Sequence, residues 1–211
     1  MSSLLDESDR TTFSGAPLHN VRAPLSDINE AFLRLLIDLA NLPGNPASDF
    51  MAELRGSLRH LTEPVSAIAA RAPVLLVDME FAHHTWWTGV AADRLKARGA
   101  RNWLTAFPRT RVIKVARSTL TLAWHLARTD PASSRVLMGM STPVMQTIAT
   151  LQPQQLDRIA ESQCLRLRPR WEDRPSVWRQ LLAGVATDQA SARAFTIRAL
   201  QLSWGTAPTP S

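Results

Sequence analysis

Apolar residues recur at helical spacing along most of this chain. The segment "SDINEAFLRLLIDLANL" (residues 26–42) carries such a stripe, and Ser26 or Asp27 is placed to cap the helix that it predicts. The stripe consists of Ile28, Phe32, Leu35, Leu36 and Leu39. Further helices are predicted over 48–61, 62–72, 85–107, 110–129, 130–140, 141–151, 152–162, 176–186 and 188–204.

Two stretches break this helical spacing. Residues 73–81, "PVLLVDMEF", follow the helix predicted over 62–72 and are rich in Val and Leu, as is typical of a short strand. Residues 164–171, "CLRLRPRW", alternate apolar and basic side chains and form the second strand candidate. The predicted fold class is all-α, with these two stretches as the only strand candidates.

Similar features recur in the same order in the two parts of the chain. "NPAS" at 45–48 is repeated as "DPAS" at 130–133, and Ile68-Ala69 is repeated 91 positions later. Phe81 and Trp171 each end a strand candidate, and Trp87 and Trp178 lie 91 positions apart in the helices that follow. This order predicts a tandem duplication.

A duplicated helical unit of this size would bury its apolar faces against its own copy. We therefore predict an intramolecular pseudo-dimer, in which the two strand candidates pair across the axis. Its interface, which would also serve partners, is assigned to Phe81, Trp87, Trp171 and Trp178. The predicted organisation is a flexible arm at 1–24, a first copy at 25–109, a second copy at 110–205 and a disordered tail at 206–211.

Composition adds a basic charge balance to this picture. The chain has 24 Lys and Arg against 18 Asp and Glu, which favours nucleic acid or other acidic partners. An arginine bias is also typical of a GC-rich genome. The single cysteine, Cys164, excludes an intramolecular disulfide and a cysteine-based zinc site. The sequence shows neither a signal peptide nor about 18 consecutive apolar residues, so we expect a cytoplasmic protein without a membrane partner.

Catalysis finds no support in the sequence. His83 and His84 are adjacent and point in different directions, which argues against a shared metal. Cys164 and His125 are interpreted as core or interface residues, and the scattered glycines form no phosphate-binding loop. We expect no enzyme activity, no cofactor, no metal and no small-molecule substrate.

Two basic stretches are the better candidates for function. Residues 109–117 place Lys114 and Arg117 one turn apart on a helix. In 166–179, alternation at Arg166, Arg168 and Arg170 would line one side of an extended chain at about 6–7 Å, a spacing suited to phosphates. The alternative is a solvated face, neutralised in part by neighbouring Glu and Asp.

A family resemblance centres on the second copy. Residues 122–170 resemble the core of FlhD, the flagellar transcriptional regulator. The shared positions are Asp130, Ala132, Ser133, Gly139, Leu151, Ala160, Glu161 and Arg170. The first copy resembles the same family in its Asp27-Ile28-Asn29 and in residues 64–81.

The resemblance implies an all-helical protein that dimerises through interlocked subunits and activates transcription together with a second protein, FlhC. The zinc-binding cysteines of that system belong to FlhC. Val136 and Leu137 stand where the family has a Phe-Arg pair linked to DNA contact, and Leu167 stands at the family's subunit-linking cysteine. The first departure puts direct DNA contact by that surface in doubt.

Two functions are therefore carried forward. The first is an FlhD-like activator subunit that works with an FlhC-like partner on promoter DNA, contacting the DNA itself or only within the complex. The alternative is a helical adaptor or anti-activator that binds a regulatory protein without contacting DNA. The candidate DNA-binding residues are Arg111, Lys114, Arg117, Asp130, Arg166, Arg168, Arg170 and Arg174.

Overall fold

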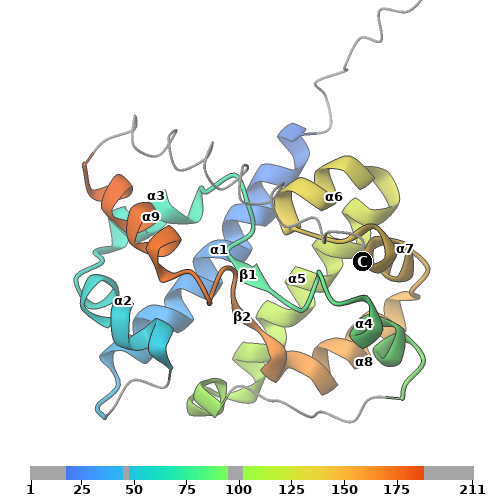
Figure 1. Ribbon diagram of the computed structural model, residues 1–211, viewed down its shortest axis with the longest axis horizontal. Helices are drawn as coiled ribbons and strands as arrows, with labels where there is room; N and C mark the ends of the chain where they lie inside the picture. The colour runs from blue at the N-terminus through green and yellow to red at the C-terminus, as the bar shows by residue number, and fades with distance from the viewer. Residues whose placement is uncertain (1–17, 45–47, 95–101, 188–211) are drawn as a thin grey trace, which may run out of the picture.

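The computed structural model describes residues 18–44, 48–94 and 102–187, and this part of the chain is predominantly helical (Figure 1). The first half (18–94) contains α1 (Leu18–Asn41), α2 (Asp49–Arg59), α3 (Glu63–Ala70), β1 (Val77–Asp78) and α4 (His84–Ala91). The second half (102–187) contains η1 (Asn102–Ala106), α5 (Arg109–Thr129), α6 (Pro131–Met138), α7 (Thr142–Ala149), α8 (Pro153–Gln163), η2 (Cys164–Arg166), β2 (Arg168–Pro169) and α9 (Pro175–Thr187).

The two halves exchange a helix. Figure 1 shows α1 and α5 at the centre, with α2, α3 and α9 gathered on one side and α4, α6, α7 and α8 on the other. Helix α9 belongs to the second half but packs on α2 and α3, whereas α4 belongs to the first half but packs on α7. Each half is thus covered by the last helix of the other.

The predicted pairing of the two strand candidates is confirmed. β1 and β2 run antiparallel, with Val77 opposite Pro169 and Asp78 opposite Arg168. Each strand has only two residues, because the second candidate begins as the 3₁₀ helix η2 and Trp171 turns the chain with a φ of 57°. We call this crossing, residues 75–81 with 166–171, the seam.

Helix α1 begins earlier than the sequence pattern predicted. It starts at Leu18, so Ser26 and Asp27 lie inside the helix and cap nothing, and the last part of the predicted N-terminal arm is helical. The reason is that Val21 and Leu25 continue the apolar stripe upstream and are buried.

The single helix predicted over 85–107 is wrong. Helix α4 ends at Ala91, and Asp93 adopts a left-handed φ of 55°, which breaks the helix. The chain becomes helical again only at η1, and the residues between, 95–101, lie outside the described part. The helix predicted over 188–204 lies outside it as well.

The two Pro-Ala-Ser motifs do not cap their helices in the same way. Asp130, the first residue of its motif, accepts a hydrogen bond from Ser133 N at 3.0 Å at the start of α6. Ser48, the last residue of its motif, accepts from Met51 N at 3.3 Å at the start of α2. Residues 45–47 lie outside the described part. The motifs therefore do not serve as equivalent anchors of a repeat.

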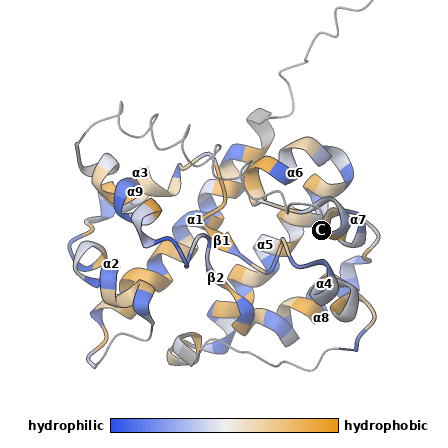
Figure 2. Ribbon diagram, viewed as in Figure 1, coloured by the Kyte–Doolittle hydropathy of each residue, from blue (hydrophilic) through white to orange (hydrophobic). Residues whose placement is uncertain are grey.

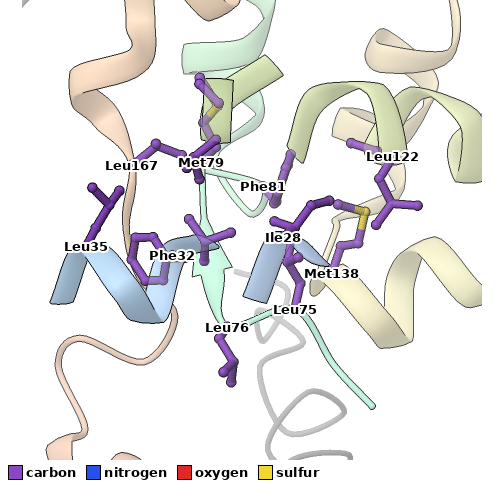
Figure 3. Close-up of a cluster of buried hydrophobic side chains, with 14 of the residues drawn as sticks. Ile28, Phe32, Leu35, Leu75, Leu76, Met79, Phe81, Leu122, Met138 and Leu167 are labelled. Carbon is purple, nitrogen blue, oxygen red and sulfur yellow. The ribbon is translucent and has the colours of Figure 1, made fainter. Parts of the chain in front are cut away.

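One continuous hydrophobic core spans both halves. In Figure 3, Ile28 and Phe32 of α1 lie beside Leu75 and Leu76 of the seam, and Leu122 of α5 lies close by. Figure 2 shows the same alternation of apolar and polar faces along the helices of both halves. Because the two halves share this core, neither buries its apolar face by itself.

The buried side chain of Asn29 joins α1 to the strand that enters the seam. Its Nδ2 donates to Val74 O at 3.0 Å and to Ala70 O at 3.2 Å, and its Oδ1 accepts from Leu76 N at 2.8 Å. An asparagine supplies both donors and an acceptor to backbone groups that have no access to water. This is a physical reason for an asparagine in the Asp-Ile-Asn motif of α1.

Asn29→Asp is expected to lower the free energy of unfolding by about 2 kcal/mol at pH 7, because the amide donors are lost and a carboxylate faces carbonyl oxygens. That environment would raise the carboxyl pKa, so the folded state binds its proton more tightly. The deficit should therefore shrink as pH falls toward ~4. Urea denaturation at several pH values measures both effects. Asn41→Asp, at an exposed position of the same helix, is the control. Equal stability of the two variants would contradict the role of Asn29.

Candidate protein-binding and nucleic-acid-binding surfaces

Arg168 joins the two strands of the seam. Its Nη2 lies 2.5 Å from Asp78 Oδ2 and 3.2 Å from Glu80 Oε2, and its Nε donates to the same Asp78 oxygen at 2.6 Å. Burial lowers the pKa of Arg168, but the carboxylates of Asp78 and Glu80 outweigh it and raise the pKa above the ordinary arginine value. The side chain is only 24% exposed, so its charge is paired with these carboxylates inside the fold.

Arg166 is engaged by the same carboxylate. Its Nη1 lies 3.7 Å from Glu80 Oε1, and its guanidinium lies over the ring of Trp86 at 5.5 Å from the centroid. Glu80 itself is buried and has a left-handed φ of 60°, a conformation that few non-glycine residues adopt. Two arginines of the second half thus converge on one buried glutamate of the first.

Arg170 is buried between the halves, with 6% of the residue exposed. Its Nη1 donates to Leu137 O at 2.7 Å and to Leu75 O at 3.4 Å, and its guanidinium stacks on Trp171 at 4.6 Å. Burial lowers the pKa of Arg170 to about 10, so the group remains charged at neutral pH. Charge-assisted bonds to carbonyl oxygens offset part of the desolvation cost.

The predicted row of three phosphate-facing arginines does not form. Arg166 lies in a 3₁₀ helix and not in an extended strand, and Arg168 and Arg170 point into contacts with the first half. The Asp and Glu residues considered as neutralising partners were sequence neighbours. Two of them do act on this stretch: Asp173 lies 3.6 Å from Arg174, and Glu172 helps to raise the pKa of Arg168. The ion-pair partners of Arg166 and Arg168, however, are Asp78 and Glu80, from about 90 positions earlier.

The basic side chains of α5 are more exposed to solvent than Arg166 and Arg168 of the seam. Arg111 pairs with Asp38 at 2.6 Å, and Arg117 pairs with Asp157 at 2.7 Å, while Lys114 is exposed. Arg174 lies apart from them, near Asp173 at 3.6 Å. The predicted set is therefore divided: Arg111, Lys114 and Arg117 share α5, and the other arginines do not join them.

Asp130, the one acidic residue in that set, has a structural partner. Its Oδ2 accepts from Ser133 Oγ at 2.5 Å, in addition to the backbone bond that caps α6. A carboxylate at a helix N-terminus stabilises the helix and repels phosphate. The structure gives Asp130 a capping role.

Three of the four aromatic residues assigned to the interface are fully buried, and Trp171 is half-buried. Trp178 of α9 packs edge-on against Phe50 of α2 at 5.5 Å, and so joins the two halves. Phe81 stacks on Trp87 at 6.1 Å, beneath the contact of α4 with α7. These side chains pack within the molecule and offer an external partner little surface.

Cys164 is a free, buried thiol at the start of η2. Burial raises its pKa, and the nearby Arg109 opposes that effect without cancelling it. We expect Cys164 in the native protein to react with a thiol reagent at least about 100-fold more slowly than in urea, because the thiolate is scarce and covered. Absorbance-monitored labelling with and without denaturant measures this, and equal rates would show that the thiol is accessible.

Sequence reasoning named Asn29 and Gly139 only as positions of the family resemblance, and it missed the roles that they and Glu80 have around the seam. Asn29, Glu80 and Gly139 are single residues whose roles depend on backbone groups distant in sequence. Within the described ranges, no three His, Cys, Asp or Glu side chains are grouped as metal ligands would be. No helix in those ranges is long and apolar enough to span a membrane.

These features define a class: a helical protein in which two halves exchange a helix and are joined by buried arginine contacts. Residues 109–202 of the chain match the family model of the flagellar transcriptional activator FlhD. The match covers the second half and continues beyond the described residues. No curated protein and no solved structure matches the chain.

Proposed function

We propose that this protein is an FlhD-like subunit of a transcriptional regulator, acting with an FlhC-like partner on promoter DNA. The match of residues 109–202 to the FlhD family model carries this proposal. The helical architecture agrees with it. In this role the chain is a scaffold, and the partner supplies much of the base readout.

We further propose that the chain is a tandem duplication folded as its own pseudo-dimer. The helix exchange supports this, because α4 on α7 and α9 on α2 are reciprocal contacts. The strand register supports it too: with a 91-residue offset, Val77 pairs with the counterpart of Asp78, and Asp78 with the counterpart of Val77. The left-handed residues Glu80 and Trp171 are separated by the same offset.

The duplication predicts that one chain completes the fold. Sedimentation equilibrium without a partner should give a species near the chain mass of 23.4 kDa. A family subunit with a single unit would need a second chain to cover its core. An obligate dimer that does not dissociate on dilution would count against the pseudo-dimer.

The regulatory role is tested by DNA binding. The chain alone, and the chain with its FlhC-like partner, are titrated against promoter DNA over a salt series. We expect the complex to bind with an affinity that falls steeply as salt rises, because phosphate contacts release counterions. If neither form binds DNA at low salt, the activator proposal fails.

The internal engagement of Arg166, Arg168 and Arg170 favours a second candidate, an adaptor or anti-activator that binds a regulatory protein alone. Arginines that already bind carboxylates and carbonyl oxygens of the same chain have few donors left for DNA phosphates. The same titration separates the two candidates. The adaptor forms a stable complex with its partner and adds no DNA affinity to it.

A further inference from the structure

The charges of the seam are divided between its two strands. Within residues 75–81 and 166–171, the charged side chains of the first half are carboxylates and those of the second half are arginines. Figure 1 shows β1 and β2 side by side at the centre of the molecule. Each strand therefore attracts the other and would repel a second copy of itself.

The counterparts of the ion-paired residues carry no charge. In the proposed duplication, α5 begins 91 residues after α1, at 109 against 18, and α9 begins 91 residues after α4, at 175 against 84. At this offset the counterparts are Leu75 for Arg166, Val77 for Arg168, Pro169 for Asp78 and Trp171 for Glu80. The two copies therefore share a fold at the seam and differ in its charge.

A seam made by two first halves would leave carboxylates without a cation. The side chains of Asp78 and Glu80 are 13% and 10% exposed. The neutral side chains of Leu75 and Val77 would take the places of their arginine partners. Only the exposed His83, 3.5 Å from Glu80, would remain beside them.

A seam made by two second halves would leave arginines without their carboxylates. The side chains of Arg166 and Arg168 are 23% and 24% exposed, and Pro169 and Trp171 would take the places of their partners. Of the attractions that raise the pKa of Arg168, only the weakest would remain, that of Glu172 in the same half.

Helix packing makes no such distinction, because α4 on α7 and α9 on α2 are reciprocal contacts. A partly buried charge that loses its partner destabilises an interface strongly, and this is a general means of rejecting a wrong partner. We propose that the charges of the seam decide which halves pair: a first half accepts a second half, of its own chain or of another copy, and rejects another first half. The ion pairs of Arg166 and Arg168 with Asp78 and Glu80 carry this specificity.

This inference rests on the proposed pseudo-dimer, and its test separates the two. A wild-type chain that is an obligate dimer would sink the pseudo-dimer before any variant is measured. A monomeric wild type whose variants fail to complement each other would sink only the role of the seam. None of these measurements involves DNA.

A charge exchange at the pair of Asp78 and Arg168 tests the specificity in the full chain. Asp78→Arg makes both strands basic at this pair and Arg168→Asp makes both acidic, so each variant should melt about 6 °C below the wild type. The chain with both substitutions should regain more than half of this loss. It should not regain all of it, because Asp78 also accepts a hydrogen bond from Phe81 N at 3.1 Å.

The two single variants should complement each other in trans. When they are unfolded in urea and refolded together, each half of the Asp78→Arg chain meets an acidic half of the Arg168→Asp chain. We expect a 1:1 species of twice the chain mass of 23.4 kDa, with a melting temperature near that of the doubly substituted chain. Native mass spectrometry distinguishes this species by mass from dimers of either variant.

The ion pair of Arg179 with Glu53 is the matched control. It also joins the two halves, at 2.7 Å between α9 and α2, but its side chains are 56% and 36% exposed. Glu53→Arg and Arg179→Glu should each lower the melting temperature by less than about 3 °C, and their refolded mixture should stay monomeric.

Either of two results would overturn the proposal. One is that Asp78→Arg and Arg168→Asp lower the melting temperature no more than the control variants do. The other is a refolded mixture in which the 1:1 species is absent or no more abundant than the dimers of each variant alone.

Discussion

Arg170→Met is expected to lower the free energy of unfolding by about 4 kcal/mol, the largest effect of a single substitution that we predict. Methionine fills much of the volume but donates nothing to Leu137 O or Leu75 O, and it removes the cation from the face of Trp171. Because these contacts join both halves, the loss should appear as one cooperative shift of the whole unfolding transition.

Urea denaturation followed by tryptophan fluorescence and by far-ultraviolet circular dichroism measures that shift. Arg179→Met is the matched control, because Arg179 is exposed and its ion pair with Glu53 should contribute less than about 1 kcal/mol. Arg170→Lys should fall between the two, since lysine keeps the charge without the planar group that stacks and donates in two directions. An Arg170→Met protein as stable as the Arg179→Met protein would refute the bridging role.

Gly139→Ala is expected to cost about 3 kcal/mol for two reasons that act together. Gly139 ends α6 with a left-handed φ of 70°, which a side chain disfavours. A Cβ atom there would also lie 2.6 Å from Arg170 Nη2, so the guanidinium would have to move away from its carbonyl partners.

Gly56→Ala is the control, and it should have the opposite sign. Gly56 lies in the exposed middle of α2, and a Cβ atom there meets nothing within 4 Å. Alanine should stabilise the helix by about 1 kcal/mol. If both substitutions were destabilising by the same amount, the contact between Gly139 and Arg170 would not be the cause.

The helices were predictable because their information is local. The stripe of α5 and the Asp130-Pro131 start of α6 follow from spacing and cap chemistry within a few residues. The early start of α1 was not predicted, because the sequence alone does not show that Val21 and Leu25 are buried in the core. The end of α4 at Asp93 rests on one backbone conformation, which apolar spacing does not encode.

The seam was predictable only in outline. The sequence identified two extended stretches and their pairing, and it identified the arginines. It did not identify the partners of these arginines. In the sequence, Asp78 and Glu80 resemble ordinary surface carboxylates, and only the fold places them next to Arg166 and Arg168. The basic face of α5 was visible as a charge run, whereas the pocket that residues of α1 and α5 line together depends on how the two helices cross.

The exchange of α4 and α9 has a consequence for the synthesis of this protein. The surface of α2 and α3 stays uncovered until α9, more than 100 residues later in the chain, has been translated. The first half therefore leaves the ribosome with an exposed apolar face, the state in which nascent chains aggregate or bind chaperones. A helix that is made late thus completes a part that was made early.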